Sequence, residues 1–113
     1  MDDNTVLLFT RNGLGEAPAD LQQALAAKFL SLTLQSDRLP AKLFFITEGV
    51  RLACAGSPVI EPLRALEAEG VELVLCQTCL NFFGLAEQVQ VGVVGGMGDI
   101  IEALAKAGKV ISL

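Results

Sequence analysis

The chain has 113 residues, enough for one domain with a real hydrophobic core, and 52% of them are hydrophobic, which excludes a disordered chain. No apolar run approaches the roughly 20 residues that cross a bilayer, so the sequence predicts a soluble globule without a membrane partner. The net charge of -5 argues against nucleic acid as a partner, and the absence of histidine excludes catalysis by an imidazole of the same chain.

The first ten residues, MDDNTVLLFT, lack the basic region and the small-residue cleavage site of a signal peptide. A cytoplasmic location is therefore expected. Because that compartment is reducing, the three cysteines are predicted to be free thiols.

Five short apolar runs, bounded by polar or turn residues, are typical of strands buried on both faces of a parallel sheet. They are Thr5–Phe9, Lys42–Thr47, Val71–Leu75, Val91–Val94 and Lys109–Leu113. Helical stretches alternate with them, at about 18–35, 57–70 and 97–107. This order predicts a single α/β domain over residues 1–113, a flavodoxin-like sandwich of about five mainly parallel strands with helices on both faces.

The first helical stretch carries apolar residues on two sides. Leu21, Leu25, Phe29 and Leu32 share one stripe at helical spacing, whereas Leu30 and Leu34 fall on the opposite side. A domain this small has few places to bury a helix completely. The pattern therefore predicts a helix shared between the core and a subunit interface, with Leu30 and Leu34 at the interface of a homo-oligomer.

Parallel sheets of this class bind ligands at the carboxyl ends of the strands, where the strand order reverses. For the strand order 2-1-3-4-5, this point lies between the loop 10–16 (TRNGLGE) and the segment 76–79 (CQTC). The prediction places Cys76 in the cleft with Arg11 as the nearest cation and Arg51 as the second. The sequence suggests four further substrate contacts, although turn, cap and solvent roles explain them as well. These are Asn12, Gly13, Thr78 and Asn81.

The CxxC pair of Cys76 and Cys79 allows several interpretations. A metal site is disfavoured because only Cys54 remains as a further cysteine and the chain has no histidine, so no bound metal is expected. A redox dithiol, or a single nucleophile at Cys76 with Cys79 as a packed neighbour, both fit the spacing. The helix dipole alone would lower the pKa of Cys76 by less than about one unit, so direct N–H bonds or a cation must help.

Three segments together cover much of the chain: EGVRLACAGS, LEAEGVELVLCQTCLNFFGL and VGVVGGMGDIIEALAKAGKVISL. Through them nearly the whole chain resembles the DsrE/DsrF-like family, most of all the C-terminal domain of YedF-like proteins. The middle segment is the most specific, with a cysteine at a strand end and Gly84 eight residues after it. In DsrE and TusD relatives, the cysteine at this position carries sulfur as a persulfide. The resemblance gives that role to Cys76; the YedF-like pattern contains both Cys76 and Cys79.

The resemblance implies oligomers, no metal and no organic cofactor. YedF-like proteins usually carry a TusA-like sulfur-carrier domain before this one, and residues 1–113 correspond to the DsrE-like domain alone. We therefore expect a cytoplasmic sulfur-relay or sulfurtransferase-like protein that exchanges sulfane sulfur with a donor or acceptor protein, for example a TusA-like carrier. Cys79 is either a thiol that resolves the persulfide or a packed cysteine. A CxxC dithiol redox protein and a non-catalytic oligomeric binding module are the alternatives.

Overall fold

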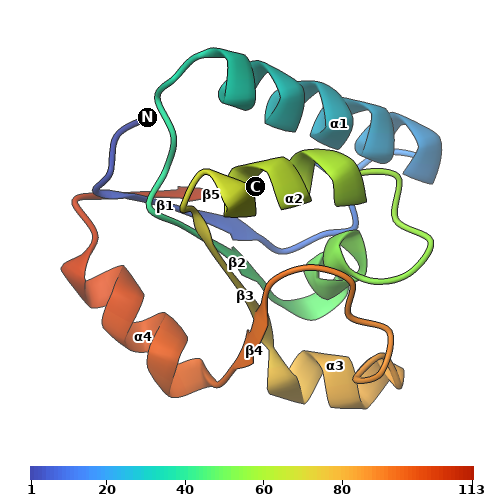
Figure 1. Cartoon of the computed structure of the whole chain (residues 1–113). Coiled ribbons are helices and arrows are strands. Elements are labelled where there is room, and N and C mark those ends of the chain that lie inside the picture. Colours follow the sequence, from blue (N-terminus) through green and yellow to red (C-terminus); the bar gives the residue numbers. More distant parts are fainter.

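Five parallel strands form the centre of the fold (Figure 1). The computed structural model describes all residues from Met1 to Leu113. The strands are β1 (Thr5–Phe9), β2 (Lys42–Phe45), β3 (Glu72–Cys76), β4 (Val93–Gly95) and β5 (Lys109–Ser112). The predicted single α/β domain with a parallel sheet and helices on both faces is confirmed.

The order of the strands differs from the one expected. It is β4-β3-β2-β1-β5, so β1 lies between β2 and β5, and β3 lies between β2 and β4. The chain adds β2, β3 and β4 successively on one side of β1 and then returns to the other side. The expected neighbourhood of the first and third strands was therefore wrong, because alternating strands and helices define a parallel sheet without defining its order. The end of β2 now separates the loop after β1 from Cys76.

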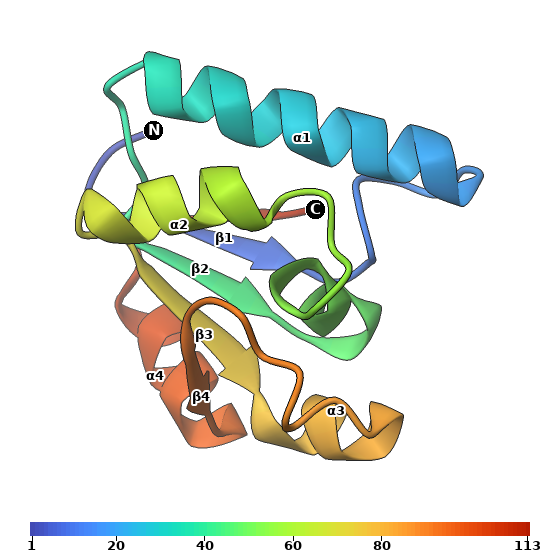
Figure 2. The ribbon, with the colours of Figure 1, turned by 45° about the vertical axis from the view of Figure 1, so that its right-hand side comes forward.

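The helices form two layers around the sheet (Figures 1 and 2). Helices α1 (Ala19–Gln35) and α2 (Ile60–Ala68) cover one face, and α4 (Met97–Lys106) lies on the other. A short 3₁₀ helix, η1 (Thr47–Ala53), follows β2, and α3 (Gln77–Phe83) continues directly from β3. No helix is both long enough and apolar enough to cross a membrane.

The core lies mainly between the sheet and the α1–α2 layer. The Phe9 and Phe45 rings stack with their centroids 5.3 Å apart, at the carboxyl ends of β1 and β2. Neighbouring strands contribute fully buried leucines to the same core, Leu7, Leu43, Leu73 and Leu75. This stack and these leucines fix the strand ends on which the candidate site is built.

Helix α1 faces the core with Ala26, Leu30 and Thr33. Leu30 is completely buried and Leu34 packs against the core, so their predicted place at a subunit interface is wrong. The exposed stripe is formed by Leu21, Leu25 and Leu32, which are 50%, 43% and 58% exposed. The apolar periodicity predicted a helix with two apolar faces but did not show which of them packs on the core. The buried residues Ala26, Leu30 and Thr33 identify that face.

Candidate functional site

The site lies at the carboxyl end of β3. Cys76 is the last residue of this strand and the N-cap of α3, and Cys79 lies in the first turn of that helix. Both are free thiols. Cys76 is only 1% exposed, whereas Cys79 is half-buried. The structure thus brings together the two predicted cysteines and gives them different access to solvent.

Thr47 connects the site to the neighbouring strands. Its backbone N–H donates a hydrogen bond to Cys79 Sγ at 3.1 Å, and its hydroxyl donates to the backbone oxygen of Thr10 at 2.5 Å. Thr47 has φ 49°, which is rare for a β-branched residue. One residue therefore joins the ends of β1 and β2 to the partly accessible sulfur.

The pKa of Cys79 is raised above its ordinary value. Burial is the largest cause; the Thr47 N–H lowers the pKa, and the neighbouring Cys76 thiol raises it further. The two cysteines are three residues apart, Cys76 at the end of β3 and Cys79 in the first turn of α3. In the resting protein Cys79 is therefore held mainly as the neutral thiol at neutral pH.

Gly49 lets η1 lie directly against the end of β1. A Cβ at this position would come within 2.1 Å of the Phe9 backbone oxygen. Only glycine permits this approach. The close contact positions the start of η1, and with it the N–H of Thr47, against the site.

Two arginines were candidate cations. Arg51, in η1, pairs with Glu48 and places its guanidinium 4.6 Å from the centre of the Phe83 ring of α3. Arg11 instead pairs with Glu16 in its own loop, at 3.5 Å. Of the two arginines, Arg51 is thus the one that contacts the helix carrying Cys79.

The remaining predicted contacts are spread around this edge. Asn12 lines a small cavity of about 160 Å³ together with Arg51, Gln23 and Ser57. Thr78 and Asn81 are exposed on α3. Gly13 is buried with φ 143°, and a Cβ there would lie 2.5 Å from Gln22, so this glycine docks the loop against α1. The structure therefore gives Gly13 a packing role.

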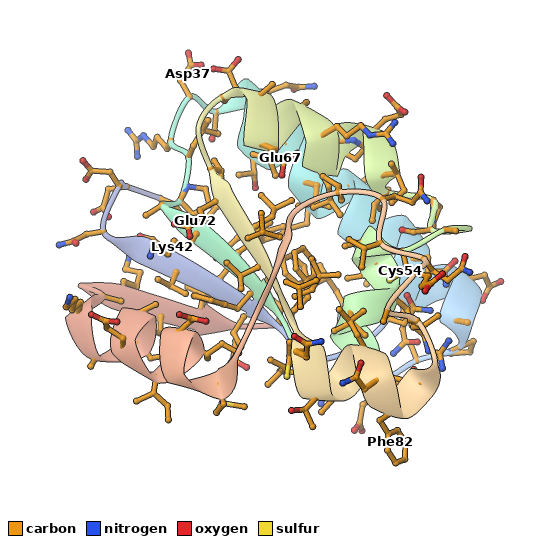
Figure 3. The ribbon with its side chains drawn as sticks, turned by 60° about the horizontal axis from the view of Figure 1, so that its bottom comes forward. Asp37, Lys42, Cys54, Glu67, Glu72 and Phe82 are labelled. Atoms are coloured by element: carbon orange, nitrogen blue, oxygen red, sulfur yellow. The ribbon has the colours of Figure 1, made fainter.

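Cys54 lies apart from the pair, at the end of η1. It is 2% exposed, burial raises its pKa, and its backbone pairs with Val89 in an antiparallel bridge. Figure 3 shows Cys54 away from α3, which carries the exposed Phe82 at its outer side. This burial indicates a packing role for Cys54.

Sequence reasoning missed Thr47. The sequence predicts it as the last residue of the second strand, but β2 ends at Phe45 and Thr47 begins η1. A threonine followed two residues later by a glycine gives only a weak signal of a turn. Its role depends on a strained backbone and on contacts with residues far away in the sequence, which local patterns do not encode.

A second cavity, larger than the one that Asn12 lines, lies away from the thiols. A groove of about 560 Å³ lies under α4, toward the amino ends of the strands, and contains no cysteine. Two ion pairs border it, Lys42 with Glu72 at 3.3 Å and Lys106 with Glu102 at 2.8 Å. The Lys42–Glu72 pair is seen in Figure 3. This groove is separate from the thiols and belongs to the α4 face.

Comparison with solved structures finds the same fold in proteins of low sequence identity. The ychN protein from E. coli has a TM-score of 0.72 at 22% identity, and the match covers 100% of both chains. A protein of unknown function from Methanobacterium thermoautotrophicum, MTH1491, has a TM-score of 0.69 at 19% identity, covering 96% of this chain and 97% of the other. The conserved protein of unknown function BT1422 from Bacteroides thetaiotaomicron has a TM-score of 0.69 at 16% identity, covering 97% of this chain and 95% of the other.

No curated protein matches the chain by sequence. The model of the DsrE/DsrF-like family matches residues 6–113, which is nearly the whole chain. This family is linked to sulfur relay. On the strength of that match, the chain belongs to the DsrE/DsrF-like family.

Proposed function

We propose that the protein is a sulfur-relay protein that carries sulfane sulfur as a persulfide on Cys76. The observation that supports this most is the placement of two adjacent free thiols at the carboxyl end of β3, in a chain of a family linked to sulfur relay. The chain has no histidine, so thiol chemistry here depends on the sulfurs and on backbone groups around them.

The proposed reaction is an exchange between a thiol and a persulfide. A thiolate of the protein attacks the outer sulfur of a donor persulfide, the donor S–S bond breaks, and the donor thiolate leaves with the electron pair and takes up the proton. Donor persulfide and protein thiol thus become donor thiol and protein persulfide. No oxidant or reductant is needed, since the number of S–S bonds is unchanged.

Burial of Cys76 suits a storage role. Its side chain is 1% exposed, so bulk thiols have little access to a sulfur bound there. A persulfide places the outer sulfur about 2 Å beyond Sγ. The Cys79 thiol, three residues later in the first turn of α3, is half-buried, so it is the thiol of the pair that a partner in solvent can reach.

Intact-mass spectrometry tests this proposal. The protein is incubated with a small-molecule persulfide donor, desalted and weighed. We expect wild type to gain the mass of one sulfur. Cys54→Ser should gain the same mass, because Cys54 is buried and lies outside the CxxC pair. Cys76→Ser should show little or no added sulfur after desalting. Lack of gain in wild type, or an undiminished gain in folded Cys76→Ser, would contradict the proposal and favour a non-catalytic binding module.

A redox dithiol is the second candidate, supported by the placement of two free thiols three residues apart at the end of β3 and the start of α3. It requires a Cys76–Cys79 disulfide that forms and is reduced during turnover. Titration with a glutathione buffer, read by thiol trapping, measures this directly. A disulfide that forms readily, together with no persulfide uptake, would replace the sulfur-relay proposal by the redox one.

The proposed partner is a protein that donates or accepts sulfane sulfur, such as a TusA-like carrier. The net charge of -5 favours a basic docking surface on that partner. Phe82 is 83% exposed on the same short helix as Cys79, which offers an apolar contact to a partner that docks on this helix. We also propose a homo-oligomer, since the exposed stripe of α1 leaves apolar surface in contact with water.

A further inference from the structure

We infer that Cys79 is the thiol that exchanges sulfur with the partner, and that Thr47 is the positioning residue that aims a backbone N–H at this sulfur. The inference rests on the proposed sulfur-relay function and adds an order to it: sulfur enters and leaves at Cys79, and Cys76 holds it inside. Both statements follow from the different surroundings of the two thiols.

Access distinguishes the cysteines first. Cys76 is buried among β3 neighbours and is 1% exposed, whereas Cys79 is partly open to solvent on α3. A direct displacement requires the attacking sulfur to reach the outer sulfur of the donor. A protein-bound donor meets Cys79 before Cys76 in this arrangement.

Hydrogen bonding distinguishes them second. The Thr47 N–H donates to Cys79 Sγ at 3.1 Å, and it lowers the pKa of this thiol against the opposing effect of burial. Hydrogen bonds to ionised acceptors are roughly twice as strong as those to neutral ones. The Thr47 N–H therefore stabilises most the states in which Cys79 Sγ carries negative charge, the attacking thiolate of the first step and the leaving thiolate of the transfer to Cys76.

The backbone of Thr47 has an unfavourable conformation that its surroundings hold in place. A β-branched residue rarely adopts a φ of 49°, and such conformations persist where the surroundings impose them. Here the Thr47 hydroxyl binds the Thr10 oxygen at 2.5 Å, and the Gly49 N–H binds the Ile46 oxygen at 2.8 Å. These two bonds fix the residue from both sides, and the N–H is left pointing at Cys79.

The reaction then has two balanced steps. The Cys79 thiolate attacks the outer sulfur of the donor, whose inner sulfur leaves as a thiolate and takes up the proton of Cys79. The Cys76 thiolate next attacks the outer sulfur of the Cys79 persulfide; Cys79 leaves as the thiolate and receives the proton of Cys76. Each step breaks one S–S bond and forms one, and release runs through the same steps in reverse.

The Thr47 part is tested on the pH profile of Cys79 alkylation by iodoacetamide, in a Cys54→Ser/Cys76→Ser background that leaves one thiol. Thr47→Val removes the hydroxyl anchor, and we expect the inflection to move to higher pH and the rate at neutral pH to fall by about tenfold, the size of one lost hydrogen bond to a charged group. Thr47→Ser keeps the hydroxyl and is expected to retain the profile. Equal profiles for the valine and serine variants would overturn the role of Thr47.

The order of transfer is tested by the rate of sulfur uptake from a protein persulfide, followed by intact mass. Cys79→Ser is expected to load Cys76 at least tenfold more slowly than wild type, with Cys54→Ser as the unaffected control. If Cys79→Ser loads at the wild-type rate, this inference fails while the proposed function stands. If wild type takes up no sulfur, the proposed function itself fails.

Discussion

Cys76 and Cys79 are only three positions apart, yet they differ in their access to solvent and in their hydrogen bonding. The strand end buries Cys76, and the first turn of α3 exposes Cys79 to solvent and to the N–H of Thr47. A buried sulfur is protected and an accessible one reacts. This division of properties is what a carrier needs, because it must hold sulfane sulfur and still exchange it.

The pKa of Cys79 gives a prediction at the same scale. Because the Cys76 thiol raises the pKa of Cys79, Cys76→Ala is expected to lower that pKa and to speed alkylation of Cys79 near neutral pH. The pH profile of alkylation in a Cys54→Ser background measures the change. An inflection that moves to higher pH in Cys76→Ala would contradict the described contact.

The same shift affects folding stability. A thiol whose pKa is raised in the folded state contributes stability that is complete below the pKa of the unfolded thiol and is lost as pH rises through the folded pKa. Urea denaturation between neutral and alkaline pH should therefore show a smaller decline in the free energy of unfolding for Cys79→Ser than for wild type. An identical decline in both proteins would count against the burial of this thiol.

At the level of elements, η1 is the part that shapes the site. It begins with Thr47, contacts β1 through Gly49 and reaches α3 through Arg51 over Phe83. The sequence predicted the strand before it and the helix after it but not η1 itself. A short 3₁₀ helix has no lasting apolar period, and its position depends on a close approach that a sequence does not reveal.

Gly49 tests the placement of η1. Gly49→Ala brings a Cβ within 2.1 Å of the Phe9 oxygen and is expected to destabilise the protein by about 2 kcal/mol or more. Gly98→Ala is the matched control, because a Cβ at this position meets nothing within 4 Å. Alanine in α4 is expected to raise the free energy of unfolding by up to about 1 kcal/mol. Both values come from urea denaturation. A neutral Gly49→Ala would show that η1 does not pack on β1 as described.

The two sides of α1 give a second element-scale test. Leu30→Ala leaves a cavity in the core and is expected to cost about 2–5 kcal/mol, whereas Leu32→Ala, at a 58% exposed position, should cost less than about 0.5 kcal/mol in the monomer. Urea denaturation at low protein concentration separates the two. Equal costs would mean that the helix is rotated relative to the description above.

For the molecule as a whole, the sequence predicted the class of fold correctly but not its topology. Runs such as TVLLF and KLFF read as buried parallel strands because both of their faces are apolar. The runs do not indicate which strands are neighbours in the sheet, so the sequence did not predict the order β4-β3-β2-β1-β5. Cys76 was still placed correctly at a strand end, because that depends on local sequence alone.

The homo-oligomer remains a prediction, and the structure changes the residues that test it. Leu25→Glu/Leu32→Glu places charges on the exposed stripe of α1 and should shift the sedimenting mass toward the monomer without unfolding the protein. Leu30→Glu is unsuitable because this side chain lies in the core. An oligomer of unchanged mass in the double variant would move the interface away from α1.

Persulfide formation on the cysteine pair is tested most directly by one mass measurement on Cys54→Ser, in which Cys76 and Cys79 are the only remaining thiols. After incubation with a persulfide donor and desalting, this variant should gain the mass of one sulfur atom, and a reducing thiol added after unfolding in urea, which exposes the buried Cys76, should remove it. No gain in the folded protein, or a gain that a reducing thiol does not reverse, would contradict the proposal that the pair carries sulfane sulfur.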